Sequence, residues 1–403
     1  MDRQIAVLKQ QYLQLVEPSS LSFPPVNLLQ QSSFQAALCS NLFTPSPTMT
    51  DIQPPPPPER YTARVLKRLI SLLSEGGGQD RIMIDRVIVG GNLPEEEGEE
   101  EEEEKVRSQP PLKKHKSDQP PASPNHHHQE IDERILNLYT RLLSNPSASS
   151  SATALLSQTA ASSKENVTYT LPPSPFSGRP IGQPITLFES RAVISGAGTT
   201  GLRTWEAALA LAEYLIASHL GRFYRFPGVT VVAGERLVEE AGSVLELGAG
   251  TGLVGIVAAR LGAGRVVVTD GDEGVCDALK AGLERNGVAD VVGVRRLMWG
   301  EEEEGDEGEV FDLVVGADVT YDNSAIPHLV AELSRQLNKN PSAKIVISAT
   351  IRNEDTFSSF RDSCAKNNLL LLEKTWTPPT PPIFYYPTNT PIRIIHVTRE
   401  SPE

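Results

Sequence analysis

A strand-like segment followed by a glycine-rich turn is the first feature of this sequence that is suited to chemistry. The segment Val244–Leu247 is apolar apart from Glu246, and Gly248, Gly250 and Gly252 follow it closely. Glycines let a backbone approach a ligand and adopt positive φ angles. A helix that begins near Gly252 then directs its free N–H groups at the ligand. The pattern therefore predicts a ligand site at this turn.

An aspartate at the end of the next predicted strand indicates that the ligand contains an adenosine ribose. Asp270 lies 20 residues after Gly250, a spacing typical of acids that bind ribose hydroxyls in dinucleotide sites. Both NAD and S-adenosylmethionine carry such a ribose, and Gly250–Gly255 fits the G-x-G-x-x-G pattern of NAD proteins. The alternative for Asp270 is a helix cap formed together with Gly271.

Glu246 is the first of two features that favour S-adenosylmethionine. A carboxylate inside an apolar strand costs free energy unless it has partners. Methyltransferases of this fold commonly carry an acid at this strand end. There it helps to organise the loop around the positively charged methionine portion of the cofactor.

The second feature is Asp318 and Tyr321, which follow the fourth predicted strand of the sheet. In a doubly wound sheet the first and fourth strands are neighbours, and ligands bind at their carboxyl ends. We therefore expect both side chains to face the cleft beside Gly248–Gly252, with Asp318 orienting an amine substrate and Tyr321 lining its channel. The alternative is a capped turn with a core tyrosine.

The elements that position these residues alternate between strands and helices. Such alternation predicts an α/β fold, a seven-stranded and mostly parallel sheet with helices on both faces. The Pro-rich connection 377–391 contains no helix, so the last two strands should pair antiparallel. A strand-like pair, 185–190 and 191–195, precedes the sheet. The sheet strands are predicted at 244–247, 266–269, 291–297, 312–317, 344–349, 369–375 and 392–397, and the helices at 252–261, 274–285, 324–337 and 354–366.

The first 145 residues form a helical accessory region according to their apolar periodicity. Four helical patterns occur around 5–15, 28–42, 65–73 and 131–142, with a disordered insert at about 76–129. Helices this short are marginal alone and must pack on each other or on the catalytic domain. A Ser/Ala-rich linker at 146–166 leads to the domain at 167–400.

Composition limits the kinds of partner. Sixteen acidic side chains lie in two runs, 95–104 and 301–309, so the net charge of −14 would be about +2 without them. Each run is either a solvated loop or an acidic flap for a basic partner. The acidic total argues against direct nucleic-acid binding. The cluster Lys113–Lys116 is either a nuclear import signal or part of a solvated linker.

The chain also lacks signals for metal and membrane. The three cysteines, Cys39, Cys276 and Cys364, follow no metal-ligand spacing and fit a reducing compartment. Neither a leader nor an apolar run of transmembrane length is apparent. We expect a soluble cytoplasmic protein with no metal site, and, since no heptad pattern occurs, a monomer.

Three motifs together resemble those of the seven-strand protein-lysine N-methyltransferases with a D-x-x-Y motif. Among these, the chain is most similar to the fungal branch of the elongation factor 2 lysine methyltransferases, which Phe384–Ile392 and the N-terminal helices also resemble. The likeness covers 185–400 well and 1–75 loosely. The three motifs are Gly198–Ala207, Leu245–Gly252 and Asp318–Tyr321.

The resemblance implies S-adenosylmethionine as cofactor and a protein lysine, on elongation factor 2, as substrate. Asp318 and Tyr321 would lie at the methyl-transfer site. Trp205 and Trp299 would lie beside the cofactor, or simply pack in the core, and Phe384–Tyr386 would either wall the lysine channel or shield the sheet edge. The implied cofactor residues are Trp205, Glu246, Gly248, Gly250, Asp270, Trp299 and Asp318.

Two other functions stay open at this point. A Rossmann-type NAD-dependent oxidoreductase would share the glycine turn, but nothing later in the chain resembles a nicotinamide or hydride-acceptor site. A non-catalytic binding module would use the N-terminal helices to hold a partner. Binding of S-adenosylhomocysteine without binding of NAD separates the first alternative from a methyltransferase.

Overall fold

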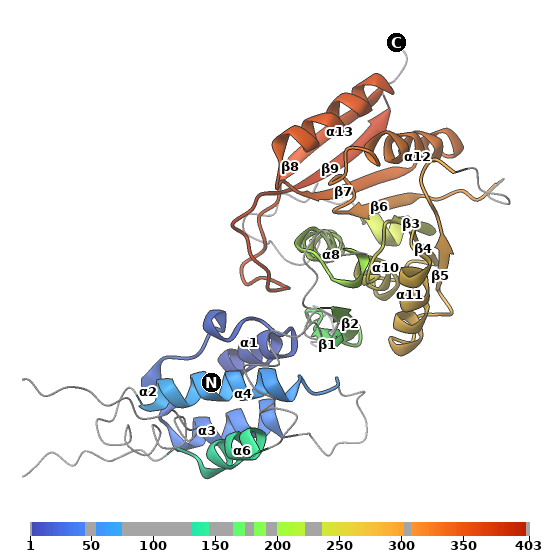
Figure 1. Cartoon of the computed structure of the whole chain (residues 1–403). Helices are drawn as coiled ribbons and strands as arrows, with labels where there is room; N and C mark the ends of the chain where they lie inside the picture. Colours follow the sequence, from blue (N-terminus) through green and yellow to red (C-terminus); the bar gives the residue numbers. More distant parts are fainter. Residues whose placement is uncertain are drawn as a thin grey trace, which may run out of the picture.

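The structure is a computed structural model that describes residues 2–44, 54–74, 131–144, 164–173, 181–190, 200–221, 236–301 and 308–399. Several sequence predictions lie outside these ranges: the insert 76–129 with its acidic run and basic cluster, most of the linker, the segment 191–195 and most of the second acidic run. In Figure 1 the N-terminal helices lie at one end of the molecule and the α/β domain at the other.

A seven-stranded mixed sheet forms the centre of the α/β domain. Its order is β5-β4-β3-β6-β7-β9-β8. The first five strands in this order run parallel, and β9 is antiparallel to both β7 and β8. The predicted fold class and the antiparallel pairing of the last two strands are confirmed. The strands are β3 (Ser243–Leu247), β4 (Arg265–Asp270), β5 (Val292–Arg296), β6 (Leu313–Ala317), β7 (Lys344–Thr350), β8 (Leu369–Thr375) and β9 (Ile392–Arg399).

Helices cover both faces of this sheet (Figure 1). Alternate residues of the central strands point to opposite faces, so the strands are apolar on both sides. Val244 of β3 joins the buried cluster with α8 and α10, whereas Leu245 joins the cluster with α12 and α13. The helices are α8 (Glu206–Leu220), α9 (Leu237–Glu240), α10 (Leu253–Arg260), α11 (Glu273–Arg285), α12 (Ile326–Lys339) and α13 (Glu354–Lys366).

A separate two-stranded sheet joins the domain to the N-terminal helices. It pairs β1 (Lys164–Tyr169) with β2 (Ile185–Ser190) in antiparallel register. The prediction of a strand at 185–190 is confirmed, and it pairs with β1; the predicted strand at 191–195 lies outside the described residues. Burial alternates poorly along β1, whose first three residues are polar and only half-buried, and this weak pattern lies partly inside the stretch that the sequence assigned to the linker.

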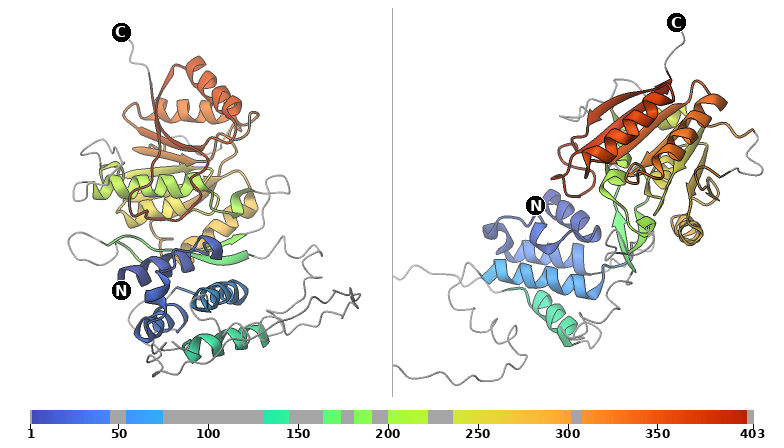
Figure 2. Two further views of the ribbon diagram at one scale, coloured as in Figure 1. Left: turned by 90° about the vertical axis from the view of Figure 1, so that its left-hand side faces the viewer. Right: turned by 45° about the horizontal axis from the view of Figure 1, so that its top comes forward.

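The N-terminal helices share one continuous buried cluster with β1, β2 and α8. Helix α4 has its apolar face buried at Val65, Leu66, Leu69 and Ile70, as its periodicity predicts. Figure 2 shows α1 beside the two-stranded sheet. The elements are α1 (Asp2–Leu13), η1 (Pro18–Ser20), α2 (Val26–Leu29), α3 (Ser32–Leu38), η2 (Cys39–Phe43), α4 (Glu59–Ser74) and α6 (Glu133–Ser144).

The Pro-rich segment between β8 and β9 fastens α1 to the catalytic domain. The backbone N–H of Tyr385 donates to Gln14 Oε1 at 3.0 Å, and the Gln14 amide donates back to the Tyr385 carbonyl. On the other side, the buried Glu213 of α8 accepts hydrogen bonds from Ile383 N, Phe384 N and the Tyr386 hydroxyl at 2.7–2.8 Å. The segment therefore binds two distant parts of the chain at once.

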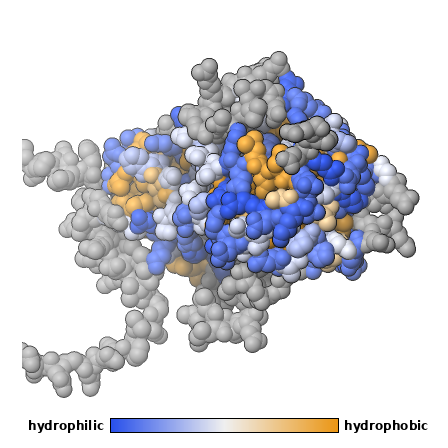
Figure 3. Space-filling model, turned by 90° about the horizontal axis from the view of Figure 1, so that it is seen from above, coloured by the Kyte–Doolittle hydropathy of each residue, from blue (hydrophilic) through white to orange (hydrophobic). Residues whose placement is uncertain are grey.

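The face of the molecule that Figure 3 shows is mostly hydrophilic. Figure 3 looks down on the end that carries β8 and α13, and apolar side chains gather near the centre of this face and over the N-terminal helices. Leu370 and Leu372 of the edge strand β8 are about half exposed. Among the helices of the described residues, none is long and apolar enough to cross a membrane.

Candidate active site

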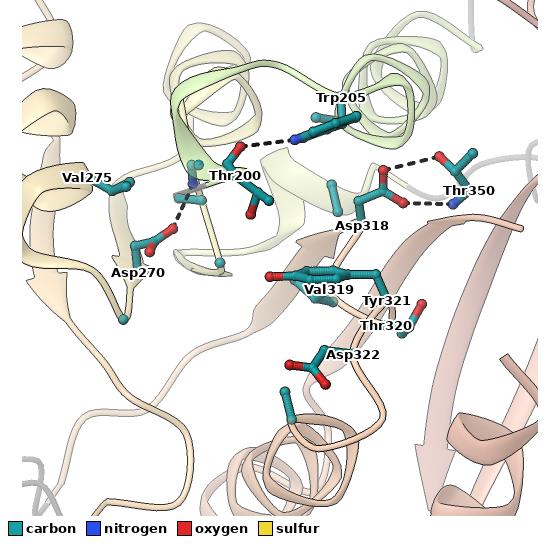
Figure 4. A pocket seen from close by; sticks show the side chains of 18 of the residues that line it. Thr200, Trp205, Asp270, Val275, Asp318, Val319, Thr320, Tyr321, Asp322 and Thr350 are labelled. Carbon is teal, nitrogen blue, oxygen red and sulfur yellow. Dashed lines mark hydrogen bonds between the residues drawn. The ribbon is translucent and has the colours of Figure 1, made fainter. Parts of the chain in front are cut away.

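A cavity of about 1060 Å³ lies at the carboxyl ends of β3, β4, β6 and β7. Figure 4 shows side chains from the ends of β4, β6 and β7 around it, with Asp270, Asp318 and Thr350 labelled. Strands β3 and β6 are direct neighbours, so the turns that follow them open to the same side. The cavity is lined by all the residues that the sequence analysis assigned to the cofactor and to the methyl-transfer site: Trp205, Glu246, Gly248, Gly250, Asp270, Trp299, Asp318 and Tyr321.

The glycine turn after β3 leaves no room for side chains. Gly248 and Gly250 have φ angles of 63° and 54°, which L-residues rarely adopt. A Cβ atom on Gly248 would lie 2.8 Å from Val319 Cγ1, and one on Gly250 would lie 3.1 Å from the Gly201 carbonyl oxygen. The turn thus needs glycine for both its conformation and its packing.

Glu246 holds the start of α10 against the end of β3. Its side chain is 2% exposed, and Oε2 accepts a hydrogen bond from the Gly255 N–H at 2.8 Å. That N–H is one of the free donors in the first turn of the helix. Burial raises the pKa of Glu246 to about 8, against the lowering effect of this hydrogen bond. Glu246 therefore fixes the conformation of the glycine turn from its buried side.

Asp270, the last residue of β4, fixes the same turn from the neighbouring strand. Its Oδ2 accepts from Gly250 N at 3.1 Å and its Oδ1 from Asp272 N at 3.1 Å. Burial raises the pKa of this carboxyl. Each carboxylate oxygen has two lone pairs, so both oxygens keep acceptor capacity for hydroxyl groups in the cavity. Asp272, and not Asp270, caps α11 by accepting from Val275 N at 2.9 Å.

Trp299 lies after β5 and close to the glycine turn. Its ring carbons would be 3.6–3.7 Å from a Cβ atom on Gly248. The indole Nε1 is buried and has no hydrogen-bond partner among the described residues. Because buried donors are normally satisfied, this N–H marks a position at which a bound ligand would supply an acceptor.

Asp318 begins the turn after β6 with a φ angle of 55°. Its Oδ1 accepts from Thr350 N at 3.0 Å, and its Oδ2 forms an ion pair with Arg352 at 3.0 Å. Burial raises the pKa of Asp318, and Arg352 opposes that rise. The dashed lines between Asp318 and Thr350 in Figure 4 show how the ends of β6 and β7 are joined.

Trp205 and Tyr321 are the aromatic walls of the cavity. Trp205 occupies the N-cap position of α8. Its indole Nε1 donates to the Thr200 carbonyl in η5 (Thr200–Leu202) at 3.0 Å. Tyr321 is 63% exposed, and Figure 4 shows its ring beside Val319 and below Asp318. An exposed tyrosine at this position lies at the mouth and is not a core residue.

Sequence reasoning missed the polar groups from the end of β7 and the start of α8. Thr350, Arg352 and Arg203 also line the cavity, and the Arg203 and Arg352 guanidinium carbons lie 4.8 Å and 5.1 Å from the Trp205 ring centroid. The strand order could have revealed them. Strand β7 lies next to β6, so the residues that follow β7 reach the same edge of the sheet as Asp318. Among the described residues, no group of His, Cys, Asp and Glu is arranged to hold a metal ion.

Of the two alternatives for Phe384–Tyr386, the structure gives no support to a wall of the lysine channel. None of the three lines the cavity. Phe384 is 1% exposed and packs edge-on against Tyr169, and Tyr386 bonds to Glu213. These three residues instead contact α8, β1 and the N-terminal helices.

Comparison with known proteins agrees with this geometry. A family model for lysine methyltransferases matches residues 192–364. The chain is 33% identical over 405 residues to the protein-lysine N-methyltransferase EFM3 of Chaetomium thermophilum, and the match covers 96% of each protein. It is 34% identical over 232 residues to EFM3 of Saccharomyces cerevisiae, which covers 54% of this chain and 66% of that protein. For the human protein-lysine N-methyltransferase EEF2KMT the identity is 32% over 203 residues, 45% of this chain and 54% of the relative. The chain therefore belongs to the protein-lysine N-methyltransferases, which take their methyl group from S-adenosylmethionine.

Proposed function

We propose that this enzyme methylates a lysine side chain of translation elongation factor 2. Its membership of the protein-lysine N-methyltransferases gives the reaction class, which leaves the NAD-dependent oxidoreductase interpretation without support. The name of the human relative EEF2KMT refers to elongation factor 2, and the likeness to the fungal EFM3 runs over 96% of the chain. The observation that carries the proposal is the one cavity shared by the glycine turn, Asp318 and Tyr321.

The residues around the glycine turn fit S-adenosylmethionine. Asp270 has free acceptor capacity for the ribose hydroxyls, and Trp299 offers an apolar ring and an unpaired N–H beside the turn. Gly248 and Gly250 let the backbone approach the ligand, and Glu246 fixes their conformation through Gly255. When bound, the cofactor supplies a methyl group on a positively charged sulfur that a neutral amine attacks.

The other half of the cavity suits the acceptor lysine. A free lysine has a pKa of about 10.4, and only its neutral form has the required lone pair. Apolar and aromatic walls favour the neutral amine because they exclude water. Trp205 and Tyr321 provide such walls, and their rings also attract methylated ammonium groups by cation–π interaction. Holding the amine in line for attack lowers the barrier by up to about 7–11 kcal/mol.

The N-terminal helices are proposed as the region that recognises the protein substrate. They pack against the catalytic domain through one continuous core and so present a surface fixed relative to the cavity. We propose that the enzyme acts as a monomer on a cytoplasmic substrate.

Transfer of a labelled methyl group tests the function. The purified protein should transfer the label from S-adenosylmethionine to elongation factor 2, and Asp318→Ala should abolish the transfer while calorimetry still detects folded protein. Titration calorimetry should also detect S-adenosylhomocysteine but not NAD. Enzyme that binds S-adenosylhomocysteine and leaves elongation factor 2 unlabelled would remove the substrate assignment.

A further inference from the structure

Arg352 connects three elements at the mouth of the cavity. It lies two residues after the end of β7, and its Nη2 is 3.0 Å from Asp318 Oδ2 and 3.0 Å from Glu206 Oε2. Its Nη1 is 3.1 Å from Asp318 Oδ2. The guanidinium carbon also lies 5.1 Å from the centroid of the Trp205 ring. One side chain thus contacts the turn after β6, the start of α8 and an aromatic wall.

The contacts of Asp318 show that its carboxylate is already largely occupied. Its Oδ1 accepts from Thr350 N, and its Oδ2 accepts from Thr350 Oγ1 and from both terminal nitrogens of Arg352. Three of these donors fill Oδ2, whereas Oδ1 keeps one free lone pair. Arg352 and Thr350 therefore fix the orientation of the Asp318 carboxylate and determine which of its oxygens stays available.

The ion pairs of Arg352 also neutralise charge at the mouth of the cavity. Arg352 faces two carboxylates, Asp318 and Glu206, and Glu206 also pairs with Arg203 at 3.7 Å. Two guanidinium groups are thus neutralised beside the path of a positively charged lysine. Without this pairing, the arginines would repel an incoming ammonium group.

Stability alone is a weak reason for this arrangement. The Arg352 side chain is 44% exposed, and ion pairs with a partly exposed member contribute little to folding. A comparable arginine exists elsewhere: Arg361 pairs with Glu354 at 3.2 Å and lies 5.4 Å from the centroid of the Phe357 ring. Arg361 does not line the cavity, so it provides a matched control.

We propose that Arg352 is a positioning residue for methyl transfer, which fixes Asp318 and Trp205 as walls of the lysine passage while Asp318 and Glu206 neutralise its own charge. The inference rests on the proposed lysine methylation and adds to it a specific residue outside the D-x-x-Y motif.

Kinetics of Arg352→Met, Arg352→Lys and Arg361→Met test the proposal. Arg352→Met should lower kcat by about tenfold to a hundredfold, as expected when a wall of the site is misplaced, with little change in the affinity for S-adenosylhomocysteine. Arg352→Lys should recover part of the loss, and Arg361→Met should match the wild type. Activity of Arg352→Met within about twofold of the wild type would overturn the proposal, as would an equal loss in Arg361→Met.

A double-mutant cycle separates positioning from general damage. If Asp318 and Arg352 act together, the variant that carries both Arg352→Met and Asp318→Asn should lose no more activity than the worse single variant. Losses that multiply would contradict the proposal. If Arg352→Met folds poorly, the test can use Arg352→Lys instead, provided that its melting temperature is near that of the wild type.

The ionisation of Asp318 gives a readout that needs no substrate. The charged groups that face Asp318 are Arg352 from the end of β7 and, behind it, Glu206 and Arg203 from the start of α8. Carbon-13 NMR titration of the Asp318 carboxyl should give a higher pKa in Arg352→Met than in the wild type, and an unchanged pKa in Arg361→Met. Equal pKa values in the wild type and Arg352→Met would overturn the proposal. If wild-type enzyme transfers no methyl group, the proposed function fails while this titration still decides the role of Arg352.

Discussion

Gly248 and Gly287 have nearly the same backbone conformation, with φ angles of 63° and 61°, in very different surroundings. A Cβ atom on Gly248 would lie 2.8 Å from Val319, whereas one on Gly287 would meet nothing within 4 Å. Both alanine variants should lose about 1–2 kcal/mol of unfolding free energy from the left-handed conformation. Only Gly248→Ala should lose a further amount of about 1–3 kcal/mol from overpacking.

The two variants should therefore differ most in cofactor binding. Gly248→Ala should weaken S-adenosylhomocysteine binding by about tenfold or more, because Val319 and the turn must move, and Gly287→Ala should bind like the wild type. Urea denaturation and titration calorimetry measure the two effects. Equal affinities in the two variants would show that the turn does not contact the ligand.

Glu246 gives the protein a specific pH dependence. Its pKa is about 8 in the folded protein and 4.5 in the unfolded chain, so the folded state holds the extra proton between these values. The free energy of unfolding should fall as the pH rises across this window, by at most about 1.4 kcal/mol per pH unit. Glu246→Gln keeps an oxygen for Gly255 N and cannot titrate, so its stability should vary less between pH 5 and pH 8.

Urea denaturation at several pH values checks this expectation. Glu240 provides the control, because this exposed acid pairs with Lys344 and has a lowered pKa. Glu240→Gln should keep the wild-type slope between pH 5 and pH 8. A slope in Glu246→Gln as steep as that of the wild type would mean that another group is responsible.

At the scale of elements, the sequence allowed all seven strands of the main sheet to be predicted to within a few residues. Strands such as β6 are apolar runs bounded by turn residues, and this pattern depends only on local sequence. The strand β1 was missed because half of it is polar, and its pairing with β2 could not be predicted because pairing depends on distant residues. Arg352 follows β7 and belongs to no recognised motif. Its position beside Asp318 could be inferred only from the order of the strands in the sheet.

The segment 376–391 shows the same limit for loops. Its aromatic residues suggested a substrate channel, but the buried Glu213 of α8 determines where they lie. Glu213 lies among buried apolar residues of α8, but the helical pattern does not reveal which distant donors it binds. Contacts of this kind join residues about 170 positions apart and cannot be inferred from spacing.

Removal of the Glu213 carboxylate should detach this segment from α8. Glu213→Ala leaves Ile383 N and Phe384 N without their acceptor, and each buried unsatisfied donor costs about 1–3 kcal/mol. We expect a loss of about 2–5 kcal/mol in Glu213→Ala and less than half of that in Glu213→Gln, whose amide oxygen still accepts both bonds. Urea denaturation measures the difference, and equal losses would contradict this explanation.

At the scale of the whole molecule, the N-terminal helices and the catalytic domain should unfold together. One buried cluster runs from Leu8 in α1 through Tyr169 in β1 to Val244 in the sheet. A shared core couples the stability of its parts. Scanning calorimetry should show one transition whose calorimetric and van't Hoff enthalpies agree. Two well-separated transitions would indicate independent units.

The hydrogen bonds between the N-terminal helix region and the segment 376–391 can form only after most of the residues between them have been synthesised. Gln10 and Gln14 meet their partners Ile383 and Tyr385 across 373 and 371 positions of the chain. At about 5–20 residues per second, a ribosome needs roughly 20–70 s to add the residues between them. The nascent N-terminal helix therefore cannot form these contacts until the segment 376–391 has been synthesised, and until then its polar partners there are replaced by water.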